Sequence, residues 1–254
     1  MRAHVAGHIA TIALDRPEKR NALTDDMLDQ LIAALDTVEA DSSVRVLLLR
    51  GNGSSFCSGV DLAEKLTRRG VEGSVEFVRL IEVFDRLDGH PNPTIAVLQG
   101  TSLAGGWELA LHCDIRFAAP DARFGMPLAR LGLVVPFPAA VRLAQIAGVS
   151  AATDLLLSAE LIDGVRAHAL GLVTHLATGT ELAAAATAHA AKIAALAPLA
   201  LREMKRLLRH VAPTPDPAAF RRFDDARQRI TGSADTEEGL RAFLERRPAR
   251  FVGR

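Results

Sequence analysis

One segment of the sequence combines a possible proton-transfer group with possible hydrogen-bond donors. It runs from Gln99 to Asp114 and reads QGTSLAGGWELALHCD. An apolar strand is predicted to end at Gly100, and a pair of glycines, Gly105 and Gly106, opens a predicted helix that carries Glu108. Unpaired N–H groups at a helix start stabilise a negative oxygen placed before them. The segment is therefore typical of an oxyanion site, although the same glycines also suit tight packing of a helix against a strand.

Two earlier segments have the composition of ligand-binding loops. The first, FCSGVDL (Phe56 to Leu62), contains Gly59, which lets the backbone adopt conformations that other residues avoid and lets a ligand approach closely. The second, LDRPEKRNALT (Leu14 to Thr24), leads from a predicted strand through a basic turn into a helix. Taken alone, the basic turn is a strand exit with solvated charges; beside a phosphate it would supply a cation.

The three segments, in this order and with these spacings, resemble those of the enoyl-CoA hydratase/isomerase, or crotonase, family. The ending SADTEEGLRAFLERRPARF (Ser233 to Phe251) resembles the family's C-terminal helix, so the resemblance covers nearly the whole chain. It implies that two backbone N–H groups, at Ser58 and Gly105, hold a thioester carbonyl while an enolate forms. It also implies that Glu108 is the general acid/base. The substrate contacts that it implies are Arg20 and Ala22 along the CoA nucleotide path, the loop residues Gly59, Val60, Asp61 and Leu62, and Leu128.

The sequence departs from the family at one catalytic position. Family hydratases use a second glutamate, in a Phe-Gly-x-Pro-Glu motif, to grip the water that adds to the double bond. The matching segment here is FGMPL, and Leu128 occupies the glutamate position, where it can neither accept nor donate a hydrogen bond. Asp121 and Arg130 lie nearby in sequence, and so does His112, for which a structural role is favoured, but no spacing directs them at the pocket.

Three functions are therefore carried forward. The leading one is an enoyl-CoA hydratase-like enzyme that acts on an acyl-CoA thioester through a stabilised enolate. A single-carboxylate enoyl-CoA isomerase or acyl-CoA decarboxylase tolerates Leu128 better, because neither reaction needs a gripped water. A catalytically impaired acyl-CoA-binding or RNA-binding protein on the same fold is the alternative of another class.

The amino-acid composition limits the kinds of partner that the protein is expected to bind. The chain has 254 residues, with 30 Lys plus Arg against 30 Asp plus Glu, so no global field attracts nucleic acid. Its two cysteines, Cys57 and Cys113, are expected to be reduced thiols rather than a disulfide framework. No run approaching a membrane span and no leader segment is recognised, so a cytoplasmic protein that contacts neither membrane nor nucleic acid is expected. No metal and no cofactor is expected, apart from the coenzyme A of the substrate.

The elements that must position these residues are predicted from periodicity. Strands are expected at 3–6 and 8–14 as a hairpin, and at 44–49, 94–98, 115–118 and 172–176. Helices are expected from Asn21 or Thr24 to about Asp41, and at 75–87 and 139–147, followed by a helical tail at 181–196, 199–210, 218–230 and 236–245. Strands alternating with helices indicate an α/β fold with parallel β-α units.

The family resemblance implies a more particular architecture and assembly. It implies a crotonase-like spiral of repeated β-β-α units with a C-terminal helical trimerisation region. We assign 1–195 to the α/β core and 196–254 to the C-terminal helical region of the same catalytic unit. A homotrimer, often paired into a hexamer, and a place in fatty acid metabolism are expected on the same ground.

Overall fold

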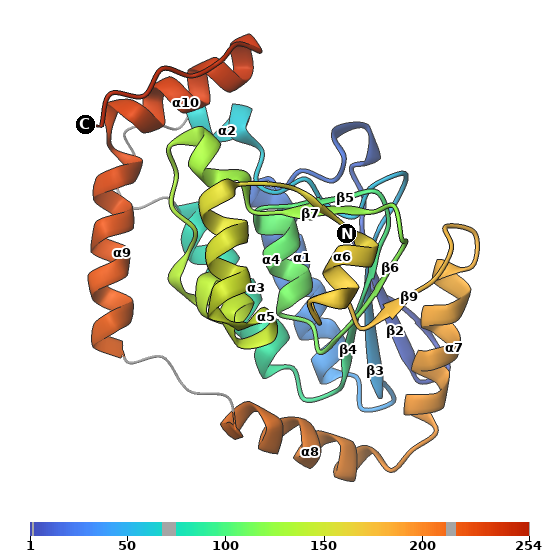
Figure 1. Cartoon of the computed structure of the whole chain (residues 1–254). Coiled ribbons are helices and arrows are strands. Elements are labelled where there is room, and N and C mark those ends of the chain that lie inside the picture. Colours follow the sequence, from blue (N-terminus) through green and yellow to red (C-terminus); the bar gives the residue numbers. More distant parts are fainter. Residues whose placement is uncertain (2, 68–74, 212–216, 254) are drawn as a thin grey trace.

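A computed structural model describes residues 1, 3–67, 75–211 and 217–253 of the chain. Its centre is a six-stranded sheet of order β1-β2-β3-β4-β6-β9 (Figure 1). The first pair is antiparallel and all other neighbours are parallel. The strands are β1 (Ala3–Ala6), β2 (Ile9–Leu14), β3 (Val46–Gly51), β4 (Thr94–Leu98), β6 (Ile115–Ala118) and β9 (His175–Leu176).

A small second sheet joins segments that the large sheet leaves apart. It has the order β5-β7-β8, with β5 (Thr101–Leu103), β7 (Arg123–Gly125) and β8 (Ile162–Asp163). Ser102 in β5 pairs with Phe124 in β7 and also forms a bridge with Cys57, which lies in the loop after β3. Three stretches of chain are thereby held side by side through backbone hydrogen bonds.

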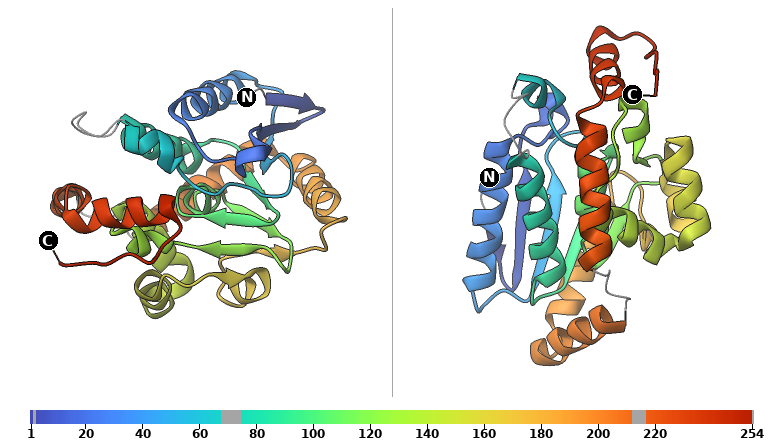
Figure 2. Two further views of the ribbon diagram at one scale, coloured as in Figure 1. Left: turned by 90° about the horizontal axis from the view of Figure 1, so that it is seen from above. Right: turned by 90° about the vertical axis from the view of Figure 1, so that its left-hand side faces the viewer.

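Helices cover both faces of the large sheet (Figure 2). On one side, α1 (Asp25–Ala40) packs against α3 (Val75–Gly89), and α7 (Leu182–Ala194) contacts β3 and β4 on the other. The short helix α4 (Gly105–Leu111) is entirely buried. The largest fully buried side chains are Trp107, Phe56, Phe84 and Phe124, so the core reaches from the sheet to α4 and β7. The remaining short elements are α2 (Leu62–Thr67), α6 (Gly164–Ala169) and two 3-10 turns, η1 (Pro17–Lys19) and η2 (Pro127–Leu131).

One helix in the described part of the chain, α5 (Phe137–Ser158), is long and apolar enough to cross a membrane by length and composition. The expectation from the sequence that no stretch approaches such a span therefore needs correction. Gly148, with φ 79° and ψ 155°, leaves the helical region inside this element and divides it into two shorter helices. Each half falls well short of the roughly 30 Å thickness of a bilayer core.

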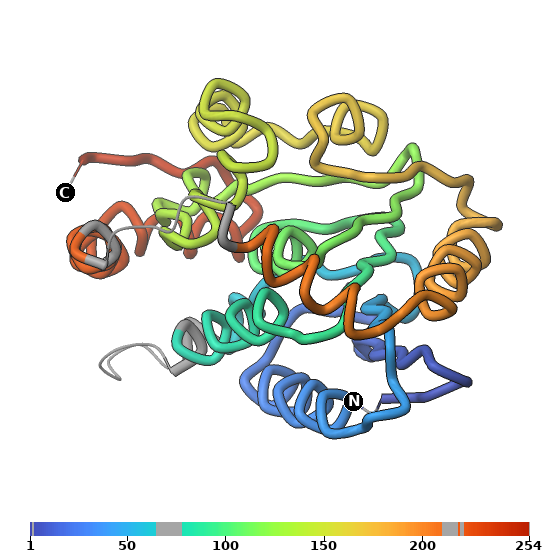
Figure 3. Tube along the Cα trace, turned by 90° about the horizontal axis from the view of Figure 1, so that it is seen from below, coloured from blue at the N-terminus to red at the C-terminus, as the bar shows by residue number. Residues whose placement is uncertain are grey.

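The chain ends in three helices, α8 (Pro198–Val211), α9 (Pro217–Thr231) and α10 (Ala234–Glu245). Figure 1 shows them in orange and red along the outside of the α/β body, and Figure 3 shows α8 passing beneath it. α7 and α8 meet at an angle of 107°. α8 exposes a row of apolar side chains, Leu199, Met204, Leu207 and Leu208.

The predicted elements are confirmed, with changes in their bounds; the strand predicted at 44–49, for example, is β3 (Val46–Gly51). Thr24, one of the two candidate helix caps, accepts a hydrogen bond from the Met27 N–H (3.2 Å) and begins α1. The last strand is shorter than predicted, because only His175 and Leu176 pair with β6, while Leu172 and Val173 are buried in the preceding turn. The helix expected at 139–147 extends to Ser158 beyond the Gly148 kink.

Candidate active site

A cavity of about 970 Å³ collects nearly all of the predicted site residues. Arg20, Ala22, Ser58, Val60, Asp61, Leu62, Gly105, Glu108 and Leu128 all line it. Gly59 is the exception. Its φ of 95° lies in the region that favours glycine, and a Cβ added there would lie 3.0 Å from the Leu103 carbonyl oxygen. Gly59 therefore permits the loop to pack closely against the strand before α4, behind the cavity wall.

Glu108 is the carboxylate of the cavity that the fold buries most deeply, with 1% of its surface exposed. It lies in the first turn of α4, whose preceding residue, Ala104, has a φ of 46°. That conformation is unusual for a residue with a side chain and is a form of strain found at functional sites. Gly106 lets α4 approach the Cys57 loop, since a Cβ there would lie 2.3 Å from the Cys57 carbonyl oxygen.

The segment around η2 supplies an apolar wall to the same cavity. Leu128, Leu131, Leu133 and Val134 come from it, and Leu80 and Leu103 add to the apolar lining. Leu128, at the position where family hydratases carry a second glutamate, thus lines the cavity together with Glu108. Asp121 and Arg130, which the sequence left without a role, are exposed residues outside the lining.

The loop after β3 requires a correction to one predicted donor. The Ser58 N–H donates a hydrogen bond to the Arg20 carbonyl oxygen (3.0 Å), so it is already engaged and is not available to a ligand. Within the described residues, the N–H groups of Val60 and Gly105 have no hydrogen-bond acceptor, and both residues line the cavity. They are neighbours, because a Cβ added at Gly105 would lie 3.8 Å from the Val60 nitrogen.

Asn21 organises this loop, a role that the sequence analysis missed. Its side-chain amide donates to the carbonyl oxygens of Ser55 (2.9 Å) and Phe56 (3.1 Å). Its backbone carbonyl oxygen accepts a hydrogen bond from the Cys57 thiol (3.1 Å). Asn21 is fully buried with a φ of 54°. An asparagine just before a helix cap is a recognisable signal for this left-handed conformation, since asparagine tolerates it better than most residues.

Both cysteines are buried free thiols, as expected. Burial raises the pKa of Cys57 to about 12, and it does the same for Cys113. A thiol in that state is not a nucleophile at neutral pH. Cys57 is therefore a structural part of the loop, through its contacts with Asn21 and Gly106.

Basic side chains gather where the η1 segment meets the cavity. Arg16, Lys19 and Arg20 line it there. Arg16 forms an ion pair of 2.6 Å with Asp61 and also donates to the Ala22 carbonyl oxygen, which ties the η1 segment to the loop after β3. Burial raises the pKa of Asp61, but the Arg16 hydrogen bond and the N–H groups of Glu64 and Ala63 outweigh it and leave that pKa below its ordinary value.

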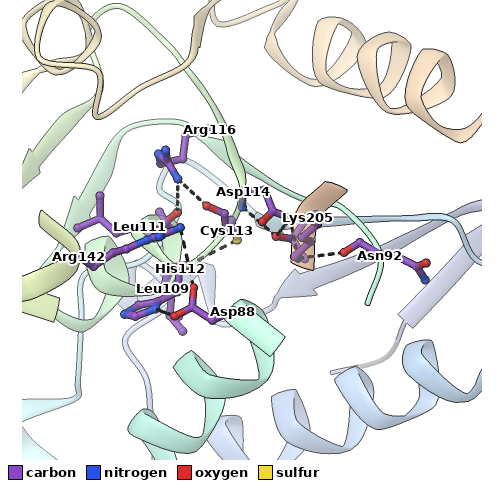
Figure 4. A network of polar contacts seen from close by, with 12 residues as sticks. Asp88, Asn92, Leu109, Leu111, His112, Cys113, Asp114, Arg116, Arg142 and Lys205 are labelled. Atoms are coloured by element: carbon purple, nitrogen blue, oxygen red, sulfur yellow. Dashed lines mark hydrogen bonds and ion pairs between the residues drawn. The ribbon is translucent and has the colours of Figure 1, made fainter. Parts of the chain in front are cut away.

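A polar network lies at the end of α4, formed by residues that do not line the cavity (Figure 4). His112, which ends α4, accepts or donates one hydrogen bond at Nδ1 with Asp88 Oδ2 (2.8 Å), and its ring stacks on Phe84. Lys205 of α8 forms an ion pair of 2.7 Å with Asp114. These contacts agree with the structural role favoured for His112. In the described part of the chain, no three His, Cys, Asp or Glu side chains are grouped to hold a metal ion.

The fold recurs in solved enzymes of the crotonase fold. A methylmalonyl-CoA decarboxylase in complex with 2-nitronate-propionyl-CoA superposes with a TM-score of 0.90 at 28% identity, over 100% of this chain and 98% of that one. An enoyl-CoA hydratase/carnitine racemase from Magnetospirillum magneticum gives a TM-score of 0.79 at 33% identity, over 99% of this chain and 95% of that one. The fold and the cavity thus define a crotonase-fold enzyme.

Sequence comparison specifies the family. The family model described as "Enoyl-CoA hydratase/isomerase" matches residues 4–254. A short-chain-enoyl-CoA hydratase of Clostridium acetobutylicum is 32% identical over 242 residues, which cover 95% of this chain and 93% of that protein. A Thermus thermophilus protein that carries an enoyl-CoA hydratase designation is 38% identical over 248 residues, 96% of this chain and 98% of that protein. The chain therefore belongs to the enoyl-CoA hydratase/isomerase family.

Proposed function

We propose that the protein is an enoyl-CoA hydratase-like enzyme that acts on an acyl-CoA thioester through a stabilised enolate. In this proposal the N–H groups of Val60 and Gly105 hold the thioester carbonyl, and Glu108 transfers the proton. The observation that carries it is the meeting, in one cavity, of a buried carboxylate with two neighbouring backbone donors that have no acceptor among the described residues.

Each of these groups fits a part of that chemistry. Donors aimed at an oxygen that becomes negative stabilise it in the transition state, and loss of one such donor costs about 10²- to 10³-fold in rate. A carboxylate that lines the same cavity as the bound acyl group can pass a proton to or from it, which is the role of a general acid/base. The basic η1 segment would face the phosphates of coenzyme A, and solved relatives carry acyl-CoA analogues.

A single-carboxylate double-bond isomerase is the second candidate, and Leu128 favours it. The wall opposite the loop is apolar around Leu128, Leu131 and Leu133, whereas hydration needs groups that orient and deprotonate a water. The other carboxylates of the lining, Asp61 and Glu64, come from the loop and α2. Mass spectrometry of the products separates the two reactions: a product heavier by one water is hydration, and an unchanged mass with a shifted double bond is isomerisation. Loss of carbon dioxide from a carboxylated acyl-CoA would instead indicate decarboxylation.

Replacement of Glu108 tests the proposal directly. Glu108→Gln keeps the shape of the side chain and removes its ability to carry a proton, so kcat on a panel of enoyl-CoA thioesters should fall by about 10²-fold or more. The matched control is Glu39→Gln on the exposed face of α1, which should leave kcat unchanged. Equal turnover by the wild type and Glu108→Gln would refute the role of Glu108. A wild type that binds acyl-CoA without any turnover would instead favour the non-catalytic alternative.

We also propose that the protein is a cytoplasmic homotrimer or hexamer that uses no cofactor beyond the coenzyme A of its substrate. The exposed side chains of Met204, Leu207 and Leu208, which share one face of α8, support assembly, because an apolar face is unfavourable in water. Sedimentation equilibrium of the wild type should report three or six chains. Leu207→Asp together with Leu208→Asp should shift the assembly toward single chains, and a wild type that sediments as a monomer would refute the proposal.

A further inference from the structure

A second cavity, of about 500 Å³, adjoins the active-site cavity. Leu133 lines both. The second cavity lies among η2, the junction of α9 with α10, and the end of the chain. Its lining is formed by Ala129, Gly132, Leu133, Arg229, Ile230, Ser233, Asp235, Phe251 and Gly253.

A partition formed by two segments of the chain separates the two cavities. Along η2, Leu128 and Leu131 line the active-site cavity, while Ala129 lines the second one. The end of α9 behaves in the same way, because Thr231 faces the active-site cavity and Ile230 the second. The two cavities therefore lie on opposite sides of the same two segments.

The backbone of this partition is fixed from behind by α10. The Gly132 carbonyl oxygen accepts a hydrogen bond from the Thr236 hydroxyl (2.6 Å), and the Leu133 N–H donates to the Leu128 carbonyl oxygen (3.0 Å). Gly239 of α10 approaches so closely that an added Cβ would lie 2.4 Å from the Leu131 carbonyl carbon. Since the backbone is held in place, a change of the Leu133 side-chain rotamer is the least costly way to connect the cavities.

The lining of the second cavity is mainly apolar, and its two charged side chains, Arg229 and Asp235, have opposite signs. Ala129, Leu133, Ile230 and Phe251 supply apolar surface. Its carboxylate, Asp235, already accepts hydrogen bonds from the N–H groups of Val252 (2.6 Å) and Gly253 (2.8 Å). The Ser233 hydroxyl is likewise engaged, since it accepts the Thr236 N–H as the cap of α10. Because Arg229 and Asp235 balance in charge, the lining carries no excess positive charge for an anion, and most of its remaining surface suits a hydrocarbon.

We propose that the second cavity is a subsite for the distal hydrocarbon end of a medium- or long-chain acyl group, and that Leu133 gates the passage to it. The proposal rests on the proposed function, because it requires an acyl thioester to be bound beside Glu108. The chain would run from Glu108 along Leu128 and Leu131 and pass Leu133 into the second cavity. Leu133 then determines which acyl lengths fit.

The test is the ratio of kcat/KM for trans-2-hexadecenoyl-CoA to that for crotonyl-CoA. Ile230→Trp fills the second cavity from α9, so the ratio should fall by about tenfold, the least that a lost methylene in a hydrophobic pocket produces. Leu133→Ala removes the gate and should raise the ratio. Val149→Trp is the matched control, because it adds the same bulk at a site on α5 that is 72% exposed and lines neither cavity, and it should not change the ratio.

The outcomes separate the subsite from the function on which it rests. If crotonyl-CoA is turned over but the ratio is the same in the wild type, Ile230→Trp and Leu133→Ala, the subsite is refuted while the proposed function stands. If the wild type turns over neither thioester, the proposed function fails first. Should Ile230→Trp not fold, as judged by near-ultraviolet circular dichroism, Ala129→Phe fills the same cavity from η2 and should lower the same ratio.

Discussion

At the scale of single residues, Leu128 is the position at which the chain departs from the second-glutamate motif of family hydratases. It lines the same space as Glu108, yet it can neither hold nor activate a water. The backbone donors are independent of it, since they come from Val60 and Gly105 on other segments. A change at this one position should therefore alter the products while the binding of the thioester carbonyl is kept.

Leu128→Glu should increase the share of hydrated product from an enoyl-CoA thioester. A second carboxylate near Glu108 can orient and deprotonate a water, and general acid–base groups contribute about 10²- to 10⁴-fold when they are well placed. Burial and the like charge of Glu108 should raise the pKa of the new carboxyl, so the gain should be larger at alkaline than at acidic pH. Mass spectrometry of the products measures that share.

Leu128→Gln is the matched control for this change. It adds a polar side chain of the same length but no base, so its product mixture should stay that of the wild type. A Leu128→Glu variant that folds, binds acyl-CoA and forms no additional hydrated product would show that the space beside Glu108 does not admit a water.

At the scale of elements, one buried cation connects α8 with the body of the molecule. Lys205 forms its ion pair with Asp114, which follows α4, and donates to the Asn92 carbonyl oxygen (3.1 Å), which precedes β4 (Figure 4). Asp114 also accepts hydrogen bonds from the N–H and hydroxyl of Thr94 at the start of β4. The pair thus holds three elements at one point.

Lys205→Met should lower the free energy of unfolding by about 1.5–3 kcal/mol, the cost of a lost hydrogen bond to a charged group. The neighbouring pair of Arg206 with Glu203 has side chains 69% and 65% exposed, and Arg206→Ala should cost less than about 1 kcal/mol because exposed ion pairs contribute little. Urea unfolding of both variants makes the comparison. Equal, small losses would mean that Lys205 does not anchor α8.

The sequence predicted elements better than it predicted their contacts. The strands at 94–98 and 115–118 appear with the predicted bounds, because runs of apolar residues between turn signals are a local property. The donor predicted at Ser58 is wrong for a reason that no local pattern contains. Which N–H of the loop faces the cavity depends on pairing with Arg20 and Leu23, which lie far away in the sequence.

Glu108 and Leu128 could be placed in advance, because each stands in a recognisable motif and their side chains alone mark the chemistry. The partition around Leu133 could not be predicted from the sequence. It forms where η2 meets α9 and α10, and η2 is separated from these two consecutive helices by about a hundred positions of chain.

At the scale of the whole molecule, a buried histidine makes stability depend on pH. Burial has the largest effect on the pKa of His90 and lowers it from its ordinary value of 6.5. A hydrogen bond with Asn92 opposes this effect, the charge of Lys205 lowers the pKa further, and the charges of Glu39 and Asp114 raise it by less. The unfolded chain therefore takes up a proton at this residue at a pH where the folded chain does not. This histidine does not reduce the free energy of unfolding above pH 6.5. As the pH falls from 6.5 toward the pKa of His90 in the folded chain, the free energy of unfolding decreases.

The free energy of unfolding should accordingly decrease between pH 7.5 and pH 5.5 by up to about 1.4 kcal/mol per pH unit for one proton, and the melting temperature should decrease with it. His90→Gln should flatten that slope, whereas His8→Gln, at an exposed position, should not. Differential scanning calorimetry at matched ionic strength measures the difference. The same slope in the wild type and in His90→Gln would assign the acid sensitivity to other groups.

The small β5-β7-β8 sheet has a consequence for how this chain can change over time. It joins the loop after β3, the entry to α4 and the strand before η2 by backbone pairing, through Cys57, Ser102 and Phe124. A mutation that keeps this backbone pairing therefore leaves the N–H groups of Val60 and Gly105 in place, whichever side chain it changes. A protein with this fold can therefore acquire a new reaction by the exchange of one or two side chains that line the cavity. Leu128 is the position at which such an exchange should be tested first.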